Sequence, residues 1–161
     1  MSKKSLVLPL ALLAMAALLA AAFAVDCVRL AAEARHRVAL ADAELAKHER
    51  RLAKLLGDSP RVTPEVQAAI AAHEEAADMR ARHSAYERLV TSFRQTMVAE
   101  VDPTNPLERK FMDDVAGAIN RREIAEKPFN NEWAAYQSFL RGRLGSVARW
   151  FSSPARADAQ P

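Results

Sequence analysis

The sequence predicts an all-α protein in which an N-terminal transmembrane helix is followed by a long antiparallel three-helix bundle of up-down-up topology. Three observations lead to this fold class. An apolar run opens the chain, apolar residues then recur at steps of three and four positions, and no stretch alternates apolar and polar residues as a half-buried strand does. Long helices that are joined by short turns are expected to lie antiparallel to their neighbours.

Composition excludes several classes of protein. The chain has 161 residues, 50% of them hydrophobic, and a single cysteine, Cys27, so neither a disulfide framework nor disorder throughout is expected. The 23 basic and 20 acidic side chains are interleaved, as between Glu44 and Lys54. Nucleic-acid binding needs basic residues clustered on one face. The sequence therefore predicts no nucleic-acid partner, and it predicts solvated helix faces for these charges, Glu49 among them.

Residues 6–25 form the predicted membrane anchor. Apart from Pro9, every residue from Leu6 to Val25 is apolar, and about 20 residues at 1.5 Å each cover the roughly 30 Å hydrocarbon core of a bilayer. The segment also fits a secretory signal peptide cleaved after Ala24, because residues 22–24 read small-x-small. The apolar run exceeds a usual signal-peptide core of about 7–15 residues, which favours a permanent anchor after a short tail, 1–5.

Basic residues flank the apolar run on both sides. Lys3 and Lys4 favour a cytoplasmic N-terminus by the positive-inside rule, which places the body of the protein on the other side of the membrane. Arg29, Arg35 and Arg37 follow the run closely and favour the opposite orientation. The first orientation is the one we expect.

The first soluble helix is expected to continue from the anchor to Leu56, with a stop at Gly57. Its apolar positions follow an a/d heptad register, which is typical of a helix that packs along a seam. These positions are Ala31, Ala34, Val38, Ala41, Leu45, His48, Leu52 and Leu55.

A second helix is expected from Thr63, a good N-cap before Pro64, to about Val101. Its weakly amphipathic middle, 80–83, is expected to pack loosely.

The third helix is expected to begin at Asn105 and Pro106 and to be kinked at Pro128. Its predicted buried side carries half of the aromatic residues of the chain. That side comprises Leu107, Phe111, Val115, Ile119, Ile124, Phe129, Trp133, Tyr136, Leu140, Leu144, Val147 and Phe151. The tail, 152–161, has no periodicity and is predicted to be disordered.

The end of the third helix contains a candidate interaction or lipid-surface site. Trp150 and Phe151 lie close to Arg143 and Arg149. Aromatic and basic residues are the side chains favoured at lipid headgroups.

A run of motifs lies in the second turn and third helix. It comprises Ala99-Glu100-Val101, Pro103, Phe111, Asn120-Arg121, Ile124-Ala125, Phe129, Asn131-Glu132 and Tyr136. The run resembles the LemA family of bacterial single-pass membrane proteins, and the similarity extends over about 28–151. The resemblance implies a helical bundle, 26–151, on a protein of the bacterial inner membrane, with its body on the periplasmic side by the charge argument above. It implies no catalytic residues, since the family has no established catalytic activity.

Catalytic and cofactor motifs are sparse. Glu44 and His48 share a helix face and His73 lies on an apolar one, but they do not complete the ligand set of a di-metal bundle. The sequence contains no Gly-x-Ser-x-Gly motif or phosphate-binding glycine loop. We therefore expect no cofactor, metal site or enzyme activity.

The expected function is that of an interaction or scaffold protein, which contacts membrane lipid through its first helix and envelope proteins or itself through its body. Two alternatives stay open. One is a secreted periplasmic adaptor or chaperone-like protein released by cleavage after Ala24. The other is a helical metal-binding protein that uses His48 and His73.

Overall fold

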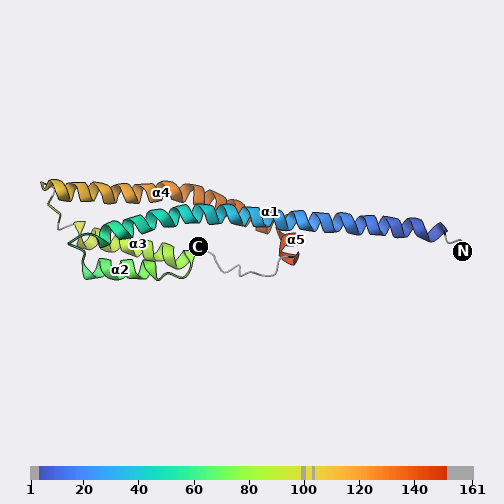
Figure 1. Cartoon of the computed structure of the whole chain (residues 1–161), viewed down its shortest axis with the longest axis horizontal. Coiled ribbons are helices and arrows are strands. Elements are labelled where there is room, and N and C mark those ends of the chain that lie inside the picture. Colours follow the sequence, from blue (N-terminus) through green and yellow to red (C-terminus); the bar gives the residue numbers. More distant parts are fainter. Residues whose placement is uncertain (1–3, 99–100, 103, 152–161) are drawn as a thin grey trace. The chain divides into compact units, whose positions relative to one another are not determined.

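The protein is helical, as its periodicity predicts (Figure 1). The structure, a computed structural model, describes residues 4–98, 101, 102 and 104–151, and side chains in this part from residue 9 onward. Within these residues there are five α-helices and no strand. The expected disordered tail, 152–161, and residues 1–3 of the expected N-terminal tail lie outside the described residues.

The first helix, α1 (Lys4–Gly57), contains both the apolar run and the predicted seam without interruption. Every seam position is buried or half-buried, and Leu52 is completely buried. The predicted stop is also confirmed, because the helix ends at Gly57 and the Asp58 amide donates a last hydrogen bond to the Lys54 carbonyl (2.9 Å).

The chain divides into two compact units. Among the described residues, the first unit contains 4–38 and 132–151, and the second contains 39–98, 101, 102 and 104–131. Each unit has its own buried cluster. In the second unit the cluster draws on all four of its helical segments, and its members other than alanine are Leu52, Leu56, Val66, Tyr86, Leu89, Val90, Phe93, Met97 and Val115.

The single second helix expected over 63–101 is not observed. Two helices, α2 (Pro64–Glu74) and α3 (Met79–Thr96), pack against each other as a hairpin instead. Thr63 caps α2 as predicted, and its hydroxyl also lies 3.1 Å from that of Thr96 at the end of α3. The break has a local cause, because the Asp78 carboxylate accepts a hydrogen bond from the Ala81 amide (2.7 Å) and starts a new helix.

The three-helix, up-down-up arrangement is not confirmed. The extra turn between α2 and α3 reverses the chain direction once more. The start of α4 (Pro106–Arg141) therefore lies beside the end of α1, where the Arg61 guanidinium and the Glu108 carboxylate form an ion pair of 2.7 Å.

α4 runs through Pro128 and ends at Arg141, and α5 (Arg143–Phe151) follows after Gly142. Asn105 and Pro106 start α4 as predicted, with the Leu107 amide donating to the Asn105 side chain (3.0 Å).

The predicted buried side of α4 is partly wrong. Val115 and Phe129 are buried, but Leu107 and Ile124 are exposed, and Arg122 takes the buried position between them. On α5, Leu144 and Phe151 were also predicted to be buried, and both are exposed.

The first unit is held together around Cys27. This side chain is buried against Ala31 of α1 and Ala148 of α5, and Phe139 and Val147 pack on the cluster. An ion pair between Arg37 and Glu132 (3.6 Å) joins α1 to α4 in the same unit.

Candidate functional site

The predicted anchor is one helix whose apolar side chains are exposed. Among the described residues, α1 is the helix long and apolar enough to cross a membrane. Every residue from Pro9 to Phe23 is exposed, and Leu18 has an exposed fraction of 72%. Val25, at the predicted end of the anchor, is 66% exposed. Leu6, at the predicted start, belongs to α1 by its backbone, and its side chain lies outside the described ones.

The four candidate surface residues near the C-terminus all lie on α5. Trp150 is 89% exposed and Phe151 62%, and Arg143 and Arg149 are exposed as well. Gly145 and Ala148 form the opposite, buried side of the helix. The structure therefore brings the four predicted residues together on an accessible surface.

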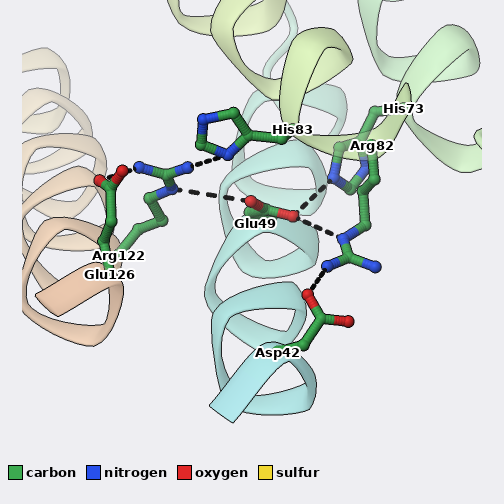
Figure 2. Close-up of polar contacts among 7 residues, drawn as sticks. All are labelled: Asp42, Glu49, His73, Arg82, His83, Arg122 and Glu126. Atoms are coloured by element: carbon green, nitrogen blue, oxygen red, sulfur yellow. Dashed lines mark hydrogen bonds and ion pairs between the residues drawn. The ribbon is translucent and has the colours of Figure 1, made fainter. Parts of the chain in front are cut away.

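A buried charge cluster, which the sequence did not predict, lies in the second unit (Figure 2). Its centre is Glu49 of α1, whose side chain is 0% exposed. One carboxylate oxygen accepts a hydrogen bond from Arg82 Nε of α3 (2.9 Å) and lies 3.6 Å from His73 Nε2 of α2. Arg82 also pairs with Asp42, about two helical turns before Glu49 on α1.

Arg122 of α4 closes the cluster from the other side. Its guanidinium, 3% exposed, lies 3.6 Å from the second oxygen of Glu49 and pairs with Glu126 one turn along its own helix. It also donates a hydrogen bond to His83 Nδ1 (2.6 Å) and stacks over the Tyr86 ring at 4.6 Å from the centroid. The cluster thus joins residues of α1, α2, α3 and α4 within one unit.

Burial and the neighbouring charges shift the pKa values of two groups in the cluster, Glu49 and Tyr86. Burial raises the pKa of the Glu49 carboxyl, but the contacts with His73, Arg82 and Arg122 outweigh burial and leave this pKa below 4.5. An arginine is a donor only, so His83 accepts this hydrogen bond at Nδ1. Burial raises the pKa of the Tyr86 hydroxyl to about 12.

The cluster corrects two predictions. Glu49 was expected on a solvated face, and residues 80–83 were expected to pack loosely, but Glu49 is fully buried and Arg82 and His83 both contact the cluster. A signal was present in the spacing. Glu49 lies four positions after one buried leucine of α1 and three before another, and Arg122 lies four positions after a buried residue of α4 and seven before the next. The positions concerned are Leu45, Leu52, Val115, Ala118 and Phe129.

The two histidines of the metal alternative contact different carboxylates. His48 contacts Glu44 (3.3 Å between Nε2 and Oε1), whereas His73 faces Glu49. Neither ring nitrogen of His73 has a hydrogen-bond partner among the described residues. No group of three or more His, Cys, Asp or Glu able to hold a metal ion occurs in the described part of the chain.

A small cavity beside the cluster offers room for water. Its volume is about 60 Å³, and its wall includes Glu49, Arg82 and Phe129. A single water needs about 10–15 Å³ of such space and polar partners, which the Glu49 carboxylate supplies. The arrangement is suited to holding helices in one register, because its contacts join side chains from α1, α2, α3 and α4.

Comparison of the chain with protein-family models, with curated proteins and with solved structures finds no match.

Proposed function

We propose that this chain is a LemA-like, single-pass protein of the bacterial inner membrane, and that its helical body acts as a non-enzymatic interaction or scaffold component of the cell envelope. The observation that carries the proposal is the exposed apolar surface of α1 from Pro9 to Phe23. Contiguous apolar surface of this extent is unfavourable in water and marks a site of contact with lipid or protein. The apolar run to which this surface belongs, 6–25, has about the 20 residues that a helix needs to cross the hydrocarbon core of a bilayer.

The sequence motifs in 99–136 support the LemA-like part of the proposal, and Lys3 and Lys4 support a body on the periplasmic side. A binding role rather than catalysis is supported by the way the buried polar groups are used. Glu49, Arg82 and Arg122 are engaged with one another across helices, and Cys27 is buried among apolar side chains.

Alkaline extraction of membranes tests the anchor, combined with the mass of the mature chain. The expected result is retention in the membrane pellet with residues 1–24 still attached. A soluble chain that begins at Val25 would overturn the proposal in favour of the secreted adaptor.

Native electrophoresis of detergent extracts tests the scaffold role. A discrete complex well above the size expected for one 17.7 kDa chain in its micelle is the expected result, either with a partner or as a self-assembly. Migration as a single chain under mild detergent, with no adduct after cross-linking in intact membranes, would count against it.

Bound metal in the purified protein, lost from a His48→Ala, His73→Ala double variant, would instead favour the helical metal-binding alternative.

A further inference from the structure

The most exposed aromatic surface in the described side chains lies on α5. Trp150 and Phe151 face solvent, and Leu144 on the same helix is exposed too. The opposite side of α5 is buried through Gly145 and Ala148. A helix with one side packed on its own protein and large apolar side chains on the other is typical of a helix lying at a membrane interface.

The packing within the first unit places α5 next to the end of the apolar run. Ala148 of α5 shares a buried cluster with Cys27 and Ala31 of α1, and Figure 1 shows α5 beside this part of α1. At 1.5 Å per residue, Cys27 lies about 3 Å and Ala31 about 9 Å beyond Val25 along the helix axis. The headgroup region on each side of a bilayer is roughly 5–8 Å thick. The contact of α5 with α1 therefore falls at headgroup depth if Val25 ends the membrane-spanning segment.

The charged side chains of α5 and of the end of α4 are all positive. Residues 133–151 contain Arg141, Arg143 and Arg149 and no aspartate or glutamate. All three arginines are exposed. Arginines near a bilayer are attracted by anionic headgroups, and tryptophan is favoured at the boundary between headgroups and acyl chains.

We propose that α5 lies in the headgroup region of the bilayer that α1 spans, with Trp150 and Phe151 at the upper acyl chains and Arg143 and Arg149 on the phosphates of anionic phospholipids. This inference rests on the proposed membrane anchor. It adds a second membrane contact, made by the other end of the described chain.

The test uses the full chain reconstituted in vesicles. The chain has two tryptophans, so Trp133→Phe leaves Trp150 as the only one. Phospholipids brominated near the top of the acyl chain should quench Trp150 fluorescence strongly. The matched control, Trp150→Phe, reports Trp133, which packs on Tyr136 and lies on α4 next to Glu132, the partner of Arg37. Arg37 is about 18 Å beyond Val25 along α1, so Trp133 should be quenched little.

Anionic lipid should strengthen the contact. Quenching of Trp150 is expected to be greater in vesicles of phosphatidylcholine and phosphatidylglycerol than in phosphatidylcholine alone. Arg143→Gln with Arg149→Gln should remove that difference, whereas Arg80→Gln, an exposed arginine on α3, should leave it. Equal quenching of Trp150 in both kinds of vesicle, measured in the Trp133→Phe chain with both arginines intact, would overturn the phosphate contact.

The two proposals fail in different ways. Loss of the chain from the vesicles on alkaline extraction would overturn the anchor itself. A chain that is retained but whose Trp150 is not quenched would overturn only the placement of α5. Blue-shifted Trp150 emission without quenching would assign this surface to a protein contact instead.

Discussion

Glu49 is a fully buried charged residue in the second unit. Its carboxylate is fully buried, yet it stays ionised because two guanidiniums face its two oxygens. The desolvation cost of a buried ion pair commonly cancels its attraction, so such a cluster adds little net stability. Its removal is costly, however, because each remaining charge is then buried without a partner.

Glu49→Gln should therefore destabilise the protein by about 3–5 kcal/mol, because it leaves Arg82 and Arg122 facing a neutral amide. Denaturant unfolding of the detergent-solubilised chain, followed by circular dichroism, measures this loss. Glu44→Gln on the same helix is the matched control, since Glu44 is exposed and pairs with Lys47 at 3.1 Å. Similar losses in both variants would show that the Glu49 contacts do not matter to the fold.

The same carboxylate predicts an acid limit to stability. The pKa of Glu49 lies below 4.5 in the folded chain, so the unfolded chain takes up the proton first as the pH falls. The contribution of Glu49 is complete above the unfolded pKa and is lost as the pH drops through the folded one. The difference in unfolding free energy between the unsubstituted protein and Glu49→Gln should shrink below about pH 4.5. A difference that stays constant down to acid pH would contradict this assignment.

At the scale of elements, the junction of α4 and α5 depends on a glycine. A Cβ atom added at Gly145 would meet the Phe139 carbonyl oxygen and would lie 2.6 Å from Leu140 Cα. Both are backbone atoms, which have little room to move. The close approach lets the buried side of α5 turn back onto the end of α4.

Gly145→Ala should accordingly cost roughly 1–3 kcal/mol or displace α5 from the Cys27 cluster. The matched control is Gly117→Ala within α4, where the nearest atoms are those of the flexible Arg121 side chain at 3.4 Å or more. That control should be neutral or stabilise the helix by about 0.5–1 kcal/mol. The free energy of unfolding is measured for both variants. Equal changes in Gly145→Ala and Gly117→Ala would contradict the requirement for glycine at position 145.

Two helix starts were predicted correctly from local sequence patterns, and a third was missed. Thr63-Pro64 and Asn105-Pro106 were predicted as helix starts and are confirmed, because capping depends on neighbouring residues alone. Asp78 uses the same chemistry, but it stands inside a weakly periodic stretch, so the break before α3 was missed.

For the whole molecule, the separation of apolar and charged segments is the dominant feature. Residues 9–23 expose apolar side chains without a single charge, whereas charged residues recur throughout the rest of the chain. A charge placed in this segment is expected to oppose membrane insertion, while the same change farther along α1 is not.

Leu13→Arg with Leu18→Arg should release the chain from membranes, because each arginine near the centre of a spanning helix costs about 2.5–3.5 kcal/mol. Leu40→Arg is the control, since Leu40 is an exposed leucine of the same helix outside the apolar run. Fractionation of cells that express each variant measures the effect. Unchanged membrane retention of the double variant would contradict anchoring by this segment.

The sequence alone determined the helical fold class, the apolar segment, the seam of α1 and two helix starts, because these follow from periodicity and from contacts between near neighbours. Only the tertiary structure decided that Glu49, Arg82 and Arg122 meet, that Ile124 gives its buried place to Arg122, and that α5 packs against Cys27. A charge is tolerated inside a core only when partners from distant parts of the chain surround it, and pattern along one helix does not reveal those partners.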